Sequence, residues 1–302
     1  MLKIYKGVTG SGKTTIPREK YHQISKDLGT EKSIVFLKNA ASVSQWRKEI
    51  NLNYIGPLHV FTYFGFIQSE LKDRWPLIEK NFDGIKGKIE PTFMNVETAH
   101  FVMSKYVEKI RKDNDVFDYI NATPSQIAVQ LIDNMNYAAM NCIDFEEIED
   151  RLIKWAGDDL EKKRLFREAV NIMSIFRSFC IKNRVIDYSL LITLFNKELM
   201  SNESYLSDLQ NRFDFLFVDN LEKTIPAAQD LYEKIMKKSE NSYMSFNPEE
   251  GINRFFGGNP DLAKKRFLKK ANIIELNQSY TSSDKARLLA EEVEDSIVNR
   301  EG

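Results

Sequence analysis

The sequence is poor in cysteine and histidine and carries almost no net charge. It has two cysteines, Cys142 and Cys180, and three histidines, His22, His59 and His100, among 302 residues. Neither set has the spacing of metal ligands, so we expect reduced cysteines and structural histidines rather than a zinc site. With a formal net charge of −1 there is no overall basic field, so any nucleic acid must be contacted through a local patch or backbone amides.

Long apolar runs and internal repeats are also missing. No stretch approaches the roughly 20 apolar residues of a membrane-spanning helix, and the first residues form a charged, strand-like segment rather than an apolar signal. We therefore expect a cytoplasmic protein with no membrane partner. The 42% of hydrophobic residues is enough for a sizeable core, and the length favours two domains.

The segment GVTGSGKT, residues 7–14, matches the phosphate-binding loop GxxxxGK[ST] in full. It lies between a predicted strand over residues 1–7 and a predicted helix over residues 14–28, which is the context that the motif requires. Its glycines allow backbone N–H groups to point at phosphate oxygens, while Lys13 would neutralise the β and γ phosphates and Thr14 would bind Mg²⁺. The predicted nucleotide-binding residues are Gly7, Thr9, Gly10, Ser11, Gly12, Lys13, Thr14 and Thr15.

A second apolar run, FDFLFVD, ends in Asp219 and is followed by a turn and a helical pattern. A carboxylate at the end of a neighbouring strand can hold the magnesium ion of a phosphate-loop site through water, so Asp219 is a candidate metal ligand. An acidic cap at a strand end is the alternative interpretation. The wide separation of Asp219 from the phosphate loop predicts a large insertion between them.

The segments in between support this organisation. Residues 33–40 and 58–63 are predicted strands, and helices are predicted after each of them. From residue 72 to 183 the pattern is mainly helical, with apolar residues at three- and four-residue spacing. The clearest predicted helices in this insertion are residues 97–113, 124–141 and 159–184.

The order of these pieces resembles the UvrD/Rep group of superfamily 1 DNA helicases. The segments that carry the resemblance are GVTGSGKTT, VFLKNAA, VFTYFGF, VIDYSLL and FLFVDNLEKTIPAAQ. The resemblance implies an α/β fold, a P-loop NTPase (RecA-like) parallel sheet flanked by helices, with ATP and Mg²⁺ as cofactors and single-stranded DNA as partner. It implies a RecA-like ATP-binding domain from residues 1–71 and 184–280, a helical insertion at 72–183, and the entry to a second RecA-like domain at 281–302.

The resemblance also implies positions that contact DNA. Asn39 and Thr62 match strand-end positions that line the track of single-stranded DNA, where small polar groups and amides bind phosphates without reading base sequence. Tyr63 follows Thr62 in the same motif, and Phe255 stands at the place of a base-stacking aromatic.

Several catalytic positions depart from the family pattern. Asn220 stands where the family has its catalytic glutamate, Glu222 and Glu250 replace glutamines, and Thr281 replaces an arginine. Losing such an arginine costs roughly 10³ to 10⁵ in rate, and losing a general base roughly 10² to 10⁴. We therefore expect Mg-ATP to bind and to be hydrolysed slowly or not at all. The predicted catalytic set is Lys13, Asp219, Glu222 and Glu250.

Two other functions stay open on the sequence. One is a nucleotide-gated DNA-binding or assembly subunit that does not hydrolyse ATP, which Asn220 favours. The other is a phosphate-loop kinase for a small molecule, although the insertion alternates basic with acidic residues and has no arginine-rich lid. If the chain is a fragment or a one-domain remnant, it cannot unwind DNA alone, and a second RecA-like domain must come in cis or from a partner helicase or nuclease subunit.

Overall fold

The structure is a computed structural model that describes residues 1–51, 56–79, 90–114, 116–248 and 252–298. The chain divides into two compact units, each described here by itself. The first unit comprises Met1–Thr62, Leu209–Thr224 and Leu231–Gly302, and the second comprises Tyr63–Asp208 and Ile225–Asp230.

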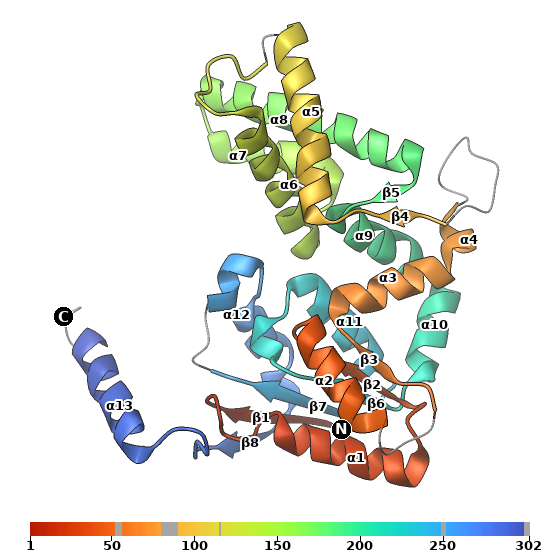
Figure 1. The fold of residues 1–302 in the computed structure, drawn as a ribbon, viewed down its shortest axis with the longest axis vertical. Coiled ribbons are helices and arrows are strands. Elements are labelled where there is room, and N and C mark those ends of the chain that lie inside the picture. The colour runs from red at the N-terminus through yellow and green to blue at the C-terminus, as the bar shows by residue number, and fades with distance from the viewer. Residues whose placement is uncertain (52–55, 80–89, 115, 249–251, 299–302) are drawn as a thin grey trace. The chain divides into compact units, whose positions relative to one another are not determined.

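A six-stranded sheet forms the centre of the first unit, and its strands are the arrows β1 to β3 and β6 to β8 in Figure 1. The strand order is β3-β2-β6-β7-β1-β8, and every neighbouring pair is parallel. The predicted α/β fold with a parallel sheet is therefore confirmed. The strands are β1 (Leu2–Gly7), β2 (Ser33–Phe36), β3 (His59–Phe61), β6 (Phe215–Val218), β7 (Asn241–Phe246) and β8 (Asn272–Leu276).

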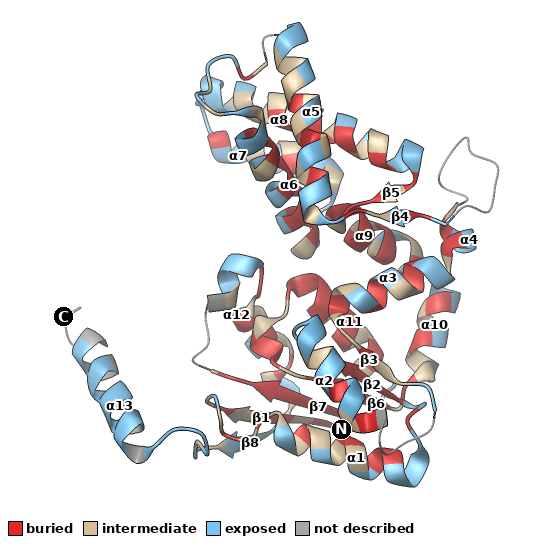
Figure 2. Cartoon of the chain, viewed as in Figure 1, coloured by how far each residue is buried: buried red, intermediate tan, exposed pale blue. Residues whose placement is uncertain are grey.

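The central strands are buried on both faces, as Figure 2 shows for β2 and β6. Their sequences, SIVF and FLFV, are nearly continuous apolar runs, which is the pattern of a parallel sheet covered by helices. One layer of the core is aromatic. The ring of Tyr21 lies edge-on to Phe217 of β6 at 5.4 Å and to Trp46 at 6.0 Å, and Tyr21 is fully buried.

Helices connect and flank these strands. The predicted strand over residues 33–40 is shorter than expected, because the Asn39 side chain accepts a hydrogen bond from the Ser42 backbone N–H and so caps the next helix. The helices with residues in this unit are α1 (Thr15–Leu28), α2 (Ala40–Asn51), α10 (Glu203–Arg212), α11 (Pro226–Met236), α12 (Pro260–Arg266) and α13 (Asp284–Val298). Short 3-10 turns cover Leu221–Lys223, Ile252–Phe256 and Leu268–Lys270.

The second unit is mainly helical, and the predicted helices at 97–113, 124–141 and 159–184 are confirmed as α5, α6 and α8. Two short parallel strands, β4 (Thr92–Phe93) and β5 (Val185–Ile186), were not predicted. Its helices are α3 (Tyr63–Asp73), α4 (Trp75–Ile78), α5 (Val96–Asn114), α6 (Pro124–Met140), α7 (Ile148–Ala156), α8 (Leu160–Asn183) and α9 (Tyr188–Leu194). A 3-10 turn at Phe145–Glu147 precedes α7, and a π-helix at Phe195–Leu199 follows α9.

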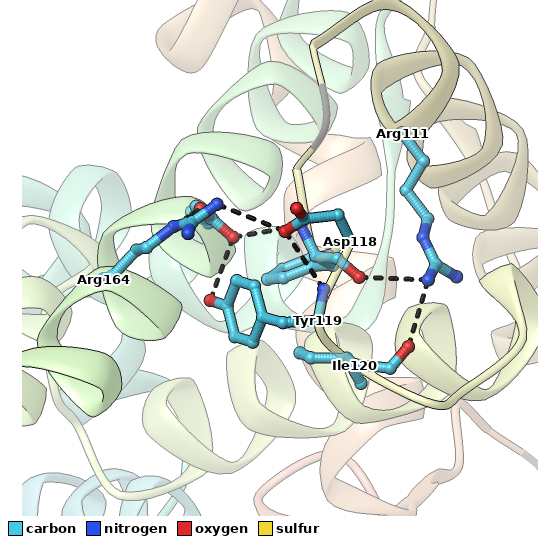
Figure 3. A network of polar contacts seen from close by, with 7 residues as sticks. Arg111, Asp118, Tyr119, Ile120 and Arg164 are labelled. Carbon is cyan, nitrogen blue, oxygen red and sulfur yellow. Dashed lines mark hydrogen bonds and ion pairs between the residues drawn. The ribbon is translucent and has the colours of Figure 1, made fainter.

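The connection between α5 and α6 is held by a polar network, drawn in Figure 3. The Arg111 guanidinium donates hydrogen bonds to the carbonyl oxygens of Phe117 at 3.0 Å, Ile120 at 3.1 Å and Ala122 at 2.7 Å. On the other side, Glu168 accepts hydrogen bonds from the Phe117 backbone N–H and from two neighbouring side chains. These bonds hold Phe117 in a left-handed conformation (φ 57°) that non-glycine residues rarely adopt.

The described residues contain no disulfide, metal-ligand cluster or membrane-spanning helix. Cys142 and Cys180 form no disulfide, and burial raises the pKa of the Cys180 thiol to about 12. Among the described residues, no three histidine, cysteine or acidic side chains gather in a way that could hold a metal ion. None of the helices within the described ranges combines the length and the apolar character that a membrane crossing demands.

Candidate functional site

The glycine-rich loop follows β1 directly and turns into α1. Gly10 and Gly12 have φ angles of 81° and 85°, in the left-handed region that favours glycine. Gly7 is required for a different reason, since a Cβ there would lie 2.5 Å from the Ser11 hydroxyl oxygen and 2.7 Å from the Leu276 carbonyl oxygen. The loop conformation therefore depends on all three glycines of the motif.

Lys13 lies inside this loop. Its side chain is 6% exposed, and its Nζ donates a hydrogen bond to the Val8 carbonyl oxygen at 3.0 Å. The first turn of the 14-residue helix α1 follows two residues later. A buried ammonium group beside the N-terminus of a helix forms an environment that favours an anion.

The strand order brings Asp219 to the same place. Asp219 follows β6, and β6 is separated from β1 by β7 alone, so the residues after the two strands lie close together. The Thr14 hydroxyl donates a hydrogen bond to Asp219 Oδ1 at 2.8 Å. The hydroxyl of Ser245, on the intervening strand β7, donates to the same carboxylate oxygen. Thr14 and Asp219 are therefore in direct contact, as expected for two groups of one site. That they bind Mg²⁺ stays a prediction.

An open cavity of about 510 Å³ lies against the loop and the start of α1. A segment after β8 forms its other wall: the Tyr280 backbone N–H donates to the Gly10 carbonyl oxygen at 2.9 Å, and the Ser279 hydroxyl to the Thr9 carbonyl oxygen at 3.1 Å. The Tyr280 side chain is 75% exposed at this cavity. The lining residues are Gly10, Ser11, Gly12, Lys13, Thr14, Thr15, Ile16, Glu19, Leu276, Tyr280 and Thr281.

Five residues of this site were not among the predicted ones. They are Ser245 on β7, and Ile16, Glu19, Leu276 and Tyr280 around the cavity. Tyr280 directly precedes Thr281, which the sequence comparison had singled out, so an aromatic residue beside that position was the available signal. Ser245 gave no signal, because a serine within a buried strand usually satisfies its own hydroxyl locally.

The turn after Asp219 carries the two unusual residues of the predicted catalytic motif. Asn220 has a left-handed conformation (φ 54°), which asparagine tolerates better than most residues. Its side-chain amide donates to Glu222 Oε1 at 3.2 Å, and the Asn247 backbone N–H donates to Glu222 Oε2 at 3.0 Å. Glu222 is 1% exposed, so both of its carboxylate oxygens accept hydrogen bonds inside the protein. This arrangement favours a positioning role for Glu222 over direct contact with an attacking water.

Asn39, Thr62, Tyr63 and Phe255 are not among the residues that line this cavity. Asn39 and Thr62 follow the carboxyl ends of the neighbouring strands β2 and β3. Phe255 is 87% exposed, and its ring lies edge-on to that of Phe256 at 5.3 Å. Tyr63 begins α3 in the second unit and is 7% exposed. Glu250 lies outside the described residues.

The sheet is parallel, and the glycine loop between its first strand and first helix surrounds a lysine. A carboxylate after a nearby strand contacts the hydroxyl at the end of that loop. These features together define a phosphate-loop NTPase. Residues 7–266 match the model of the UvrD/REP helicase N-terminal domain, and the chain belongs to this family. Nucleotide use and DNA binding are general properties of such helicase domains. No curated protein gives a significant match to the chain.

Proposed function

We propose that this chain is the ATP-binding first RecA-like domain of a UvrD/Rep-type DNA helicase and that it binds Mg-ATP at the glycine loop. The main support for this proposal is the 2.8 Å hydrogen bond between Thr14 and Asp219, two residues 205 positions apart in the chain. A chance match to the phosphate-loop motif would not bring a strand-end carboxylate to the motif's own hydroxyl.

The donor chemistry at this point fits a magnesium ion. Mg²⁺ prefers hard oxygen ligands and is usually held by one or two protein groups together with waters and phosphate oxygens. The Thr14 hydroxyl and the Asp219 carboxylate supply such oxygens. Lys13, buried beside the N-terminus of α1, supplies the positive charge for the β and γ phosphates.

The cavity next to the loop is proposed to hold the rest of the nucleotide. Its volume of about 510 Å³ lies within the usual range for ligand pockets, which is roughly 300 to 1,000 Å³. The exposed ring of Tyr280 offers a flat apolar face to a base. We therefore add Tyr280 to the proposed nucleotide-binding residues.

Hydrolysis is proposed to be weak. Asn220 cannot accept a proton from an attacking water, and Glu222 is buried with both oxygens engaged. The neutral Thr281 lines the cavity at the position where the resembling family has an arginine. The motif of this chain is therefore degenerate at the positions that act in the transition state, while the positions that hold ground-state phosphates are complete.

Single-stranded DNA is the proposed partner, and three residues of the sheet unit are its proposed contacts. Phe255 offers an exposed ring on which a base can stack, and stacking of this kind tolerates any sequence. Asn39 and Thr62 follow the carboxyl ends of two adjacent parallel strands, as expected for polar groups that line a phosphate backbone. The predicted organisation, with a RecA-like domain at 1–71 and 184–280 around an insertion at 72–183, is part of this proposal.

The proposal is tested by titrating the protein with a non-hydrolysable ATP analogue in a calorimeter, with and without Mg²⁺. We expect binding that Mg²⁺ strengthens, and we expect Thr14→Val and Asp219→Asn to remove the Mg²⁺ effect. Thr224→Val, which removes a hydroxyl bonded to the Leu221 carbonyl oxygen, is the control that should keep it. A protein that ignores the analogue under all conditions would refute the proposed function.

A second candidate is a nucleotide-gated DNA-binding subunit in which ATP is bound but not spent. The hydrogen bond between Asn220 and Glu222 favours it, because this pair occupies the place where a free carboxylate would be needed. Phosphate release separates the two candidates. Release that single-stranded DNA stimulates supports the helicase domain, whereas tight ATP binding with no release at any DNA concentration supports the gated subunit.

A further inference from the structure

Ser245 lies near the end of β7, the strand between β6 and β1, and its side chain is fully buried. It belongs neither to the glycine loop nor to the residues that line the neighbouring cavity. Its hydroxyl nevertheless contacts two consecutive residues of the turn after β6, Asp219 and Asn220. A single buried hydroxyl therefore joins the middle strand of the site to the proposed metal-side carboxylate.

The direction of these hydrogen bonds follows from the groups themselves. The Asn220 backbone N–H can only donate, so the Ser245 oxygen accepts from it, at 2.8 Å. The one proton of Ser245 is then directed to Asp219 Oδ1. The Thr14 hydroxyl donates to the same oxygen at 2.8 Å. Asp219 Oδ1 is thus the acceptor for two hydroxyl groups.

The hydroxyl groups of Thr14 and Ser245 have different proposed relations to a bound metal ion. Under the proposed function, on which this inference rests, the Thr14 oxygen becomes a ligand of Mg²⁺ and its contact with Asp219 must adjust. Ser245 is held by the backbone of Asn220 and takes no part in the nucleotide cavity. We infer that Ser245 is a positioning residue that orients the Asp219 carboxylate for Mg²⁺ through a hydrogen bond that metal binding leaves intact.

A purely structural role for Ser245 makes a different prediction. A serine that only ties β7 to the turn after β6 would affect the stability of the sheet and leave the affinity for Mg²⁺ unchanged. Ser242 on the same strand offers a matched comparison. It is also buried, and its hydroxyl has no hydrogen-bond partner among the described residues.

The experiment compares Ser245→Thr with Ser245→Val, two changes that add nearly the same volume but differ in the hydroxyl. Mg²⁺ is titrated into the intact protein at a fixed concentration of a fluorescent ATP analogue, and thermal unfolding of each variant is followed in parallel. Groups that orient a metal ligand typically change metal affinity by about 10- to 100-fold when removed. We expect a loss of this size for Ser245→Val and an affinity close to wild type for Ser245→Thr.

Controls keep the inference falsifiable. Ser242→Val should lower the unfolding temperature without changing the affinity for Mg²⁺. If the added methyl group unfolds both variants at position 245, Ser245→Ala is compared with Ser242→Ala in the same titration, with the same expected loss for Ser245→Ala alone. Equal Mg²⁺ affinity of hydroxyl-bearing and hydroxyl-free variants overturns the inference and leaves the proposed function standing. If the wild-type protein binds no Mg-nucleotide, the proposed function itself fails.

Discussion

The hydrogen bond between Asn220 and Glu222 leads to a prediction about how catalysis could be restored. The Asn220 amide nitrogen lies 3.2 Å from Glu222 Oε1 in a buried turn. Replacing Asn220 by glutamate alone would set two carboxylates against each other. At a separation of about 4 Å and an effective dielectric constant near 20, their repulsion is about 4 kcal/mol. One of the two would then stay protonated at neutral pH, because a neighbouring negative charge raises the pKa of a carboxyl.

The double variant Asn220→Glu with Glu222→Gln avoids this conflict. A glutamine at position 222 can donate from its amide nitrogen to the new carboxylate, while its carbonyl oxygen still accepts the Asn247 backbone N–H that now bonds to Glu222 at 3.0 Å. The same two hydrogen bonds are kept with one polarity reversed, and a carboxylate is placed directly after Asp219. A positioned general base contributes about 10² to 10⁴ in rate, and we expect phosphate release to rise by that factor.

The assay is phosphate release at saturating Mg-ATP, with and without single-stranded DNA, for the wild type, both single variants and the double variant. We expect the Asn220→Glu protein to be less stable and to gain little activity, so the double-mutant cycle should show strong coupling between the two positions. If the single Asn220→Glu variant is as active and as stable as the double variant, the carboxylates do not face each other. If the double variant binds Mg-ATP normally but gains no activity, position 220 is not where the base acts.

Three further predictions concern the loop, the second unit and the DNA contact. Gly10→Ala should abolish nucleotide binding in the calorimeter, because its Cβ would lie 1.9 Å from the Thr281 hydroxyl oxygen and because a φ of 81° is strained for alanine. Adding Thr281→Ala removes the contact but not the backbone strain, so it should restore binding only in part. Arg111→Met removes three hydrogen bonds from a charged donor to carbonyl oxygens. In urea denaturation it should therefore lower the free energy of unfolding by at least about 3 kcal/mol. An unchanged midpoint of the urea transition would contradict this. Phe255→Ala should weaken single-stranded DNA binding by about 1 to 3 kcal/mol in a fluorescence anisotropy titration, whereas Tyr137→Ala, at an exposed aromatic of the second unit, should not.

Local pattern was enough for the parts of this protein whose conformation depends on neighbours in sequence. The glycine loop was identified because φ angles near 80° at Gly10 and Gly12 are a local requirement. Helices α5, α6 and α8 were predicted from a periodicity that the helix itself imposes. The apolar runs of β2 and β6 predicted strands, and the family resemblance implied the parallel sheet to which they belong.

Other features depended on which strands lie side by side, and a sequence read alone does not determine that order. The placement of β7 between β6 and β1 brings Ser245 to Asp219, although nothing around Ser245 marks it as part of a site. The same holds for Tyr280, which reaches the glycine loop only because β8 pairs with β1. The sequence by itself determined the loop, the acidic strand end and the α/β class. The tertiary structure decided which hydroxyl and aromatic groups surround them, because pairing between distant strands is set by packing over the whole sheet.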